Sequence, residues 1–263
     1  MKRKKTTIDF WKAWWDERAK PSISDREIDR GSARVLDELE RRSKQQFLEA
    51  IDPKKDDLVL DAGCGTGANF SAISSSVHGI VGLDFSGEQL KRAEKRIAAD
   101  KLSNVKLALG SVTQIDFGNS TFDKVICTSV LQYLNDEECE TACREMIRVC
   151  KDGGIIVIHA KNRTSVYGVL LRVQKFIARR IGRKTTPDYY RPRAWYGKTL
   201  AKYGGEIVDF DAFGIFNFSP LPFSAVHRLL KLEMKWIKSK KLKAFGVNYK
   251  MTVRVTKAGR QQN

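Results

Sequence analysis

The chain has 263 residues, 42% hydrophobic and 30% charged, which is typical of a globular protein and excludes a disordered or low-complexity one. No apolar run approaches the ~18 residues that span a bilayer, and no signal peptide is recognisable, so we expect a cytoplasmic protein. The formal charge of +17 is uneven, because residues 161–263 hold 23 basic and five acidic side chains (net +18) while residues 1–160 carry a net −1.

The N-terminal 52 residues are predicted to be helical. Trp11, Trp14 and Trp15 recur at i, i+3 and i+4, so they share one helix face that can dock on the core, cover a ligand, or do both. A second helical pattern runs from residue 24 to 51, and Asp52-Pro53 ends it. We expect residues 1–52 to form a helical lid.

Strand and helix patterns alternate through residues 53–160. Strands are predicted at 58–61, 79–84, 105–109, 124–128 and 155–159, with helices at 68–75, 86–99 and 137–149 and a turn at 151–154. Such alternation is typical of right-handed βαβ units in a doubly wound parallel sheet. Residues 53–160 are therefore predicted to be the ligand-binding core.

The alternation stops after His159. Helices are predicted at 164–184, 196–203 and 225–241, and strands at 206–215 and 248–256. A short strand that directly follows a helix near the C-terminus fits antiparallel pairing. The sequence thus predicts an α/β fold: a Rossmann-like, doubly wound, seven-stranded sheet with an antiparallel last strand, an N-terminal helical lid, and helical insertions after strands five and six. Residues 161–263 form its basic C-terminal part.

A glycine-rich loop, Gly63-x-Gly65-x-Gly67, follows the first core strand and precedes a helix. Glycines there let the backbone approach a ligand closely and adopt positive φ. A dinucleotide-binding loop has the same pattern, and Asp84 at the end of the next strand suits the ribose of either kind of ligand. Asp61 distinguishes the two, because a carboxylate before the first glycine can face an ammonium group and would repel a pyrophosphate.

The loop and the later strand-end motifs resemble class I S-adenosylmethionine (SAM)-dependent methyltransferases, in particular the small-molecule group that includes quinone- and lipid-methylating enzymes. The resemblance covers residues 45–160 well and 186–256 loosely. It implies SAM as cofactor, with Asp84 on the ribose hydroxyls and Phe85 packed on adenine. The full set of implied cofactor-binding residues is Asp61, Gly63, Cys64, Gly65, Asp84, Phe85, Ser111, Val112 and Thr128. Ser111 stands where the family usually has Asp, and its hydroxyl accepts a weaker hydrogen bond from the adenine amino group.

Two residues are candidates for the chemistry. Methyl transfer from a sulfonium requires an aligned nucleophile and exclusion of water, and a hydroxyl of high pKa also requires a general base. His159 ends the fifth strand at the carboxyl edge, where it can act as the base, position the acceptor, or be only a structural hydrogen-bonding group. The resemblance places Tyr133, after the fourth strand, against SAM or the acceptor. Tyr189 and Tyr190 can line the acceptor pocket or simply pack.

The cysteines indicate no disulfide framework, because none of the five forms a C-x-x-C pair. Cys139 and Cys143 fall at i, i+4 on a predicted helix, which makes a metal site conceivable. Since no histidine is near them in sequence, we expect buried thiols and no metal.

The basic C-terminal part contains two amphipathic helical patterns, at residues 166–183 and 226–238. Their apolar sides can either cover the sheet or lie on an anionic membrane, where each basic group contributes ~1 kcal/mol. No Pro-Pro-Tyr/Phe run follows the fourth strand, which argues against DNA as substrate, whereas the basic surface leaves RNA open. Nothing in the sequence specifies an oligomeric state.

The preferred function is methyl transfer from SAM to a small-molecule acceptor. We expect an oxygen of an amphipathic or lipid-linked molecule, met by a cytoplasmic protein that attaches peripherally to the inner face of a membrane. One alternative acceptor is a soluble sugar or natural-product intermediate. From another class, the alternatives are an RNA-binding methyltransferase and a non-catalytic SAM-binding protein.

Overall fold

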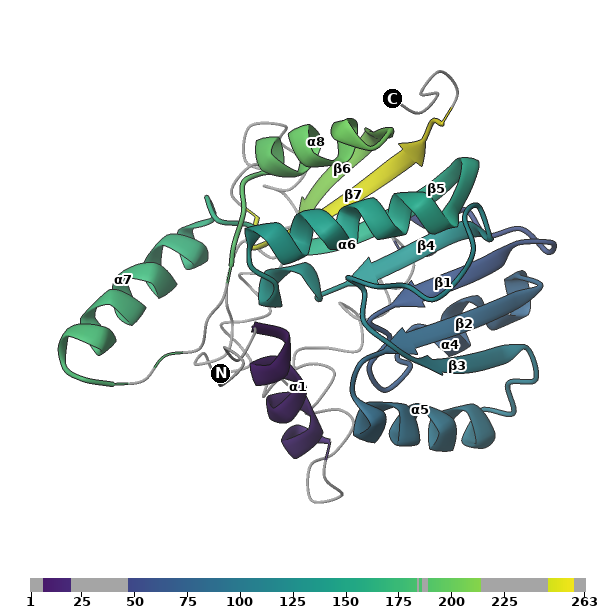
Figure 1. Cartoon of the computed structure of the whole chain (residues 1–263), viewed down its shortest axis with the longest axis horizontal. Helices are drawn as coiled ribbons and strands as arrows, with labels where there is room; N and C mark the ends of the chain where they lie inside the picture. Colours follow the sequence, from purple (N-terminus) through teal and green to yellow (C-terminus); the bar gives the residue numbers. More distant parts are fainter. Residues whose placement is uncertain (1–6, 20–46, 184, 186–188, 214–245, 258–263) are drawn as a thin grey trace, which may run out of the picture.

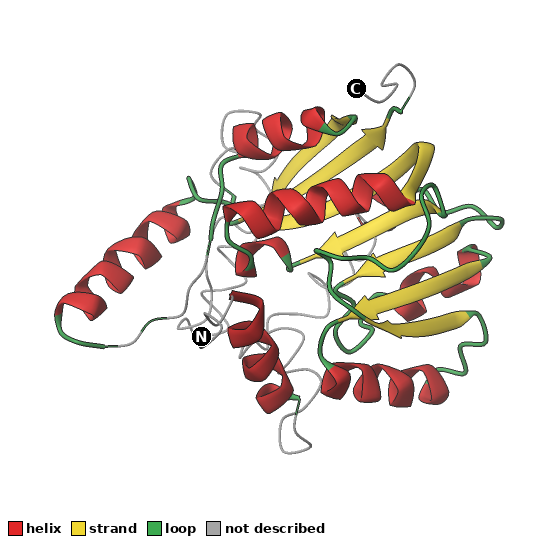
Figure 2. Cartoon of the chain, in the orientation of Figure 1, coloured by secondary structure: helices red, strands yellow, loops and turns green. Residues whose placement is uncertain are grey.

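The computed structural model describes residues 7–19, 47–183, 185, 189–213 and 246–257. A seven-stranded sheet runs through the described chain in the order β3-β2-β1-β4-β5-β7-β6, with helices on both faces (Figures 1 and 2). The strands are β1 Leu58–Ala62, β2 Gly79–Asp84, β3 Val105–Leu109, β4 Phe122–Thr128, β5 Cys150–Lys161, β6 Gly205–Phe213 and β7 Asn248–Val255. The first five are parallel, and β7 is antiparallel to both β5 and β6, which confirms the predicted fold.

Alternation along the central strands divides the core between the two faces. Leu60 and Val125 belong to the cluster that packs against α6 (Asp136–Val149) and α8 (Arg193–Lys202). Their neighbours Val59 and Ile126 belong to the cluster that contains α4 (Phe70–Ile73), α5 (Gly87–Ala99) and the helical residues 47–51. Because both faces are covered, the central strands read as nearly continuous apolar runs.

Local sequence explains where the principal helices begin. Asn135 accepts a hydrogen bond from the backbone of Glu138, whose side chain accepts one from the backbone of Asn135, and this capping box starts α6. Ser86 caps α5 by accepting from the backbone N–H of Gln89. Both helices therefore begin immediately beside strand ends, at the carboxyl edge of the sheet.

Two elements differ from prediction. The helix predicted over 68–75 is α-helical only in α4 and continues as the 3₁₀ turn η1 (Ser74–Ser76). The turn predicted at 151–154 lies inside β5, which begins early because Cys150 pairs with Phe122; a register shift accommodates Gly153, whose φ is +72°. Most of the helix predicted over 24–51 lies outside the described residues, which show its last part, 47–51, as helical. The helix predicted at 225–241 and most of the insertion after strand six also lie outside them.

Two further helices flank the carboxyl edge. α1 (Thr7–Arg18) lies beside the ends of the parallel strands, and α7 (Val166–Arg180) projects away from the sheet after β5 (Figure 1). No helix among the described residues is both long and apolar enough to cross a membrane.

Candidate active site

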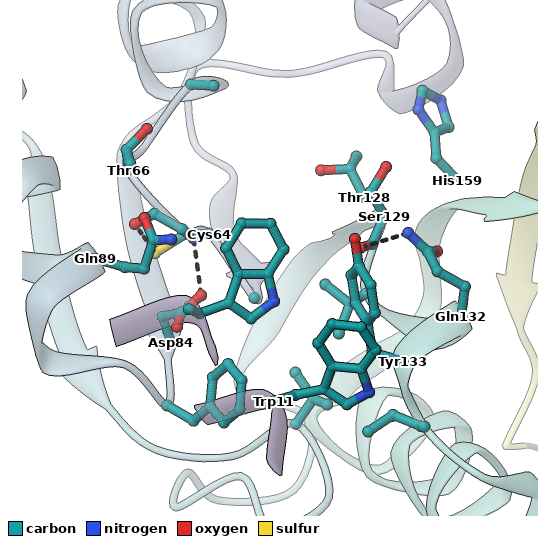
Figure 3. Close-up of a pocket in the computed structure, with 18 of the residues that line it drawn as sticks. Trp11, Cys64, Thr66, Asp84, Gln89, Thr128, Ser129, Gln132, Tyr133 and His159 are labelled. Carbon is teal, nitrogen blue, oxygen red and sulfur yellow. Dashed lines mark hydrogen bonds between the residues drawn. The ribbon is translucent and has the colours of Figure 1, made fainter. Parts of the chain in front are cut away.

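A cavity of about 590 Å³ lies at the carboxyl edge of the sheet, between the strand ends and α1. Open α/β sheets bind ligands at this edge. Ten of the eleven predicted site residues line the cavity: Gly63, Cys64, Gly65, Asp84, Phe85, Ser111, Val112, Thr128, Tyr133 and His159. Figure 3 shows Cys64, Asp84 and Gln89 on one side, facing Thr128, Ser129, Tyr133 and His159 on the other.

The glycine loop is shaped by three residues with positive φ, at +82° for Gly63, +55° for Gly65 and +77° for Gly67. A Cβ on Gly63 would lie 2.3 Å from Cγ2 of Val130, so this glycine is required by packing. A Cβ on Gly65 would meet nothing within 4 Å, although Gly65 lines the cavity. The backbone of Gly65 therefore leaves open space that a ligand can approach closely.

Asp84 is held by backbone amides at the end of β2. Its Oδ2 accepts a hydrogen bond from Gly65 N and its Oδ1 from Ser86 N, both at 2.9 Å. Burial raises the pKa of this carboxyl to about 6, against the opposing effect of the backbone amides of Ser86, Gly65 and Phe85. A carboxylate has about four acceptor sites, so Asp84 can still accept from a hydroxyl donor.

Helix α1 contacts the same region. A side-chain hydrogen bond joins Ser86, which caps α5, to Asp16 of α1. Arg92 of α5 donates to the backbone carbonyl of Ala19, which directly follows the helix, at 2.8 Å. The position of α1 is thus tied to the end of β2 that carries Asp84.

Asp61 is the one predicted site residue that does not line the cavity. It is fully buried, its Oδ2 accepts from Asn69 Nδ2 at 3.2 Å, and its Oδ1 has no hydrogen-bond partner among the described residues. Burial raises its pKa to about 7. Asn69 lines the cavity and also donates to Thr128 Oγ1 at 3.3 Å, so it separates Asp61 from the cavity and links β1 to β4.

Several buried polar atoms around the cavity lack a partner within the described part of the chain. These atoms are Trp11 Nε1, Arg18 Nε, Gln89 Oε1 and Gln132 Oε1, and all four residues line the cavity. Buried polar groups are rarely left unpaired in native proteins. Together with the open space above Gly65 and the lone pairs of Asp84, they fit a polar ligand with hydroxyl, amine and carboxylate groups, as SAM has.

Sequence reasoning missed Arg18, Asn69, Gln89 and Gln132. The signal for Asn69 was a polar residue at a helix start next to the glycine loop. The others carry no local signal. Gln89 lies in α5 and Gln132 in a short 3₁₀ turn, and only the tertiary fold determines that their side chains point into the cavity.

The part of the cavity beside Tyr133 is aromatic. The ring centroid of Tyr133 lies 4.5 Å from that of Trp11 and 5.7 Å from that of Trp15. His159 is edge-on to Phe47 at 5.9 Å. Burial, and secondarily the charge of Lys250, lower the pKa of His159 to about 4, so its imidazole is neutral at pH 7.

Two other tyrosines lie away from the cavity lining. The backbone N–H of Tyr189 donates to the carbonyl of Gln132 at 2.8 Å, and neither Tyr189 nor Tyr190 is among the lining residues. Beside them, the guanidinium of Arg191, which is 3% exposed, donates to the carbonyls of Leu131 and Leu134 at 2.9 and 2.6 Å. This segment therefore supports the loop that carries Tyr133.

Residues 59–154 match the family model of a methyltransferase domain. A demethylmenaquinone methyltransferase of Geobacillus stearothermophilus is 28% identical over 190 residues, 69% of this chain and 80% of its own. A phosphatidylethanolamine N-methyltransferase of Cereibacter sphaeroides is 35% identical over 122 residues, and the alignment spans only 58% of that relative's length. The magnesium protoporphyrin IX methyltransferase of Synechocystis, solved with bound S-adenosylhomocysteine, has the same fold, with a TM-score of 0.64 over 93% of this chain and 99% of its own at 16% identity.

The sheet order, the glycine loop and these matches define the chain as a class I SAM-dependent methyltransferase. SAM is its cofactor.

The cysteines are buried thiols, as predicted. All five are free and buried, among them Cys139 and Cys143 in α6. The hydrogen bond between the thiol of Cys143 and Cys139, together with burial, raises the pKa of Cys143 well above its usual value, so this thiol stays protonated and unreactive.

Proposed function

We propose that the protein transfers the methyl group of SAM to an oxygen of an amphipathic or lipid-linked small molecule at a membrane surface. The observation that carries the proposal is the division of one cavity into a polar part beside Asp84 and an aromatic part beside Tyr133. A flat or apolar acceptor buries its surface against indole and phenol rings more favourably than a sugar does. The names of the relatives point the same way, since one acts on a quinone and another on a phospholipid.

In this proposal the polar part holds the cofactor. Asp84 accepts hydrogen bonds from the ribose hydroxyls, the backbone around Cys64 and Gly65 lies against the amino-acid moiety, and Phe85 packs on adenine. Ser111 Oγ accepts from Thr113 N at 3.2 Å, and when its hydroxyl donates to Thr113 Oγ1, 2.8 Å away, its second lone pair can accept from the adenine amino group. Val112 and Thr128 complete the wall. Asp61 acts through Asn69: the Asn69 amide N–H groups donate to Asp61 and Thr128, which leaves its carbonyl oxygen to accept a hydrogen bond from the ammonium group.

His159 and Tyr133 face the acceptor. An imidazole whose pKa is about 4 is a weak base, so it orients an acidic hydroxyl better than it deprotonates an alcohol. We therefore assign His159 to accept a hydrogen bond from the acceptor hydroxyl and Tyr133 to pack beside it. A phenol fits this arrangement, because it ionises with little assistance; its oxygen bonds to the methyl carbon as the bond from that carbon to sulfur breaks, and its proton is released.

A lipid amine is a second candidate acceptor. The phosphatidylethanolamine N-methyltransferase of Cereibacter sphaeroides is 35% identical over its aligned region, and a neutral amine needs no base. The phenol ring of Tyr133 and the neighbouring indole rings of Trp11 and Trp15 would also attract the amine in its ammonium form.

Methyl incorporation from radiolabelled SAM tests the proposal. The protein is incubated in parallel with lipid-extract vesicles, a water-soluble metabolite extract, and RNA. We expect label in the organic phase of the vesicle reaction, on oxygen by mass spectrometry, and its loss in Asp84→Asn. Label on nitrogen would favour the lipid amine, while label confined to water-soluble molecules or RNA would refute a lipid-linked acceptor.

A further inference from the structure

The apolar side of α7 faces solvent. Six large apolar side chains on and just after this helix are 43–64% exposed: Val169, Leu170, Val173, Phe176, Ile177 and Ile181. One of the two sequence-based interpretations was that such a stripe covers the sheet, and for α7 the structure contradicts it. A contiguous apolar stripe on an exposed helix is a feature of interaction surfaces.

The charge around this stripe has one sign. Arg172, Lys175 and Arg179 lie on the side of the helix opposite the stripe, and the chain has no Asp or Glu between residues 161 and 187. The guanidinium of Arg180 lies 5.2 Å over the ring of Phe176, which places a cation at the border of the stripe. Amphipathic helices of this kind lie in the plane of a membrane surface, with the apolar side in the acyl boundary and the basic side at lipid phosphates.

The base of α7 is fixed to the edge of the active site. Ser165 accepts from Gly168 N and donates to Asn162 O, each at 2.9 Å, and Asn162 is buried with its Nδ2 on Gly246 O at 2.7 Å. Lys161, one residue before Asn162, lines the cavity. The helix projects from the carboxyl edge, the side on which α1 also lies (Figure 1). A surface to which α7 binds therefore lies close to the cavity.

We propose that α7 is the arm that docks this enzyme on an anionic lipid bilayer. The inference rests on the proposed function, since it supplies the surface from which a lipid-linked acceptor would enter. Charge complementarity favours lipid over a second copy of the chain, because two copies would bring together like-charged helices of a protein with a formal charge of +17. RNA would engage only the basic side and leave the apolar stripe in water.

Vesicle sedimentation without SAM tests the docking. Wild-type protein should bind vesicles of phosphatidylglycerol and phosphatidylcholine at 0.1 M salt, bind phosphatidylcholine alone much more weakly, and lose most binding at 1 M salt. The double variant Phe176→Ser/Ile177→Ser should lower the partition coefficient at least tenfold. The matched control Val208→Ser removes an apolar side chain that is 42% exposed on β6, and should leave binding within twofold of wild type.

Unchanged vesicle binding in the double variant would overturn the proposal. So would a wild-type dimer in light scattering that the double variant dissociates, since α7 would then be a subunit interface. Calorimetric SAM binding by the same variants should stay at the wild-type value, which shows that they are folded. Methyl transfer to detergent-solubilised lipid without vesicle binding would contradict the docking proposal and leave the proposed function standing. Vesicle binding without methyl transfer to any lipid would contradict the proposed function and leave the docking proposal standing.

Discussion

The backbone N–H of Gly65 donates a hydrogen bond to Oδ2 of Asp84 across 2.9 Å. Gly65 follows β1, and Asp84 is the last residue of the adjacent parallel strand β2, which pairs with β1 through Ala62 and Leu83. The bond therefore joins the glycine loop to the end of β2. Asp84 is 6% exposed, and its carboxylate is stabilised by the loop amide and by Ser86 N. The loop conformation and the charge of Asp84 therefore depend on each other.

Asp84→Asn should weaken SAM binding about 10- to 100-fold. The substitution keeps the size of the side chain but removes the charge from its hydrogen bonds, and a hydrogen bond to a charged group contributes about 1.5–3 kcal/mol. Calorimetric titration with SAM measures the effect. Asp209→Asn, an exposed residue on β6, is the matched control and should bind as wild type does. An affinity within threefold of wild type in Asp84→Asn would show that this carboxylate does not hold the ribose.

The ligand-free protein should lose stability as the pH rises from about 4 to 7. Burial raises the pKa of Asp84 to about 6 and that of Asp61 to about 7, above the ~3.9 of an unfolded Asp. A raised pKa means that the folded state binds protons more tightly, so the contribution is complete below pH 4 and is lost through pH 6–7. The lowered pKa of His159 acts in the opposite direction between about pH 4 and 6.5, so it offsets the effect of one of the two carboxyls. Differential scanning calorimetry should therefore show a net Tm decrease smaller than two carboxyls alone would give.

The same titration can be separated by mutation. Asp61→Asn removes one of the two carboxyls and should flatten the fall in Tm between about pH 6 and 7, where Asp61 is the carboxyl that still titrates and an amide does not ionise. Asp209→Asn, whose side chain is exposed, should leave the wild-type slope unchanged. A steep fall that persists in Asp61→Asn would show that this carboxyl is not the group that titrates.

The sheet and the glycine loop could be predicted because their signals are local. Short, nearly continuous apolar runs such as Leu58–Ala62 indicate buried strands, and the glycines fall where the backbone has positive φ. The partners of Asp61 could not be predicted, since Asn69 reaches both Asp61 and Thr128 only after β1 and β4 have paired. Periodicity also marked α7 as amphipathic, but could not tell an exposed apolar side from a buried one, because that depends on where the chain leaves β5.

Arg191→Lys should destabilise the fold and perturb the loop that carries Tyr133. The guanidinium donates to the carbonyls of Leu131 and Leu134 and to Asp136 Oδ1, and lysine cannot reproduce this planar fork. Leaving buried carbonyls unpaired costs about 1–3 kcal/mol each, so we expect the free energy of unfolding to fall by about 3 kcal/mol.

Urea titration measures this difference, and Arg193→Lys is its control. The Arg193 guanidinium lies 4.4 Å over Phe210 on an exposed part of α8, where replacement should cost less than about 1 kcal/mol. Equal losses for the two variants would show that the buried fork has no special role.

Alanine substitution in the glycine loop should separate binding from packing. A Cβ at Gly63 would lie 2.3 Å from Val130, so Gly63→Ala should lower the free energy of unfolding by several kcal/mol and express poorly. A Cβ at Gly65 meets only open space, so the folding cost is limited to about 1 kcal/mol for an alanine at a φ of +55°. That Cβ projects into the cavity, however, and should weaken SAM binding more than tenfold.

Gly87→Ala completes the comparison. A Cβ there also meets nothing within 4 Å, but Gly87 opens α5 and does not line the cavity. Alanine is favoured over glycine in a helix, so this variant should bind SAM as wild type does and be equally or slightly more stable. Thermal unfolding with and without SAM reports both quantities in one experiment. If Gly65→Ala kept the wild-type thermal shift with SAM, the ligand would not approach the loop at that residue, and the cofactor would have to lie nearer to Thr128 and Gln132.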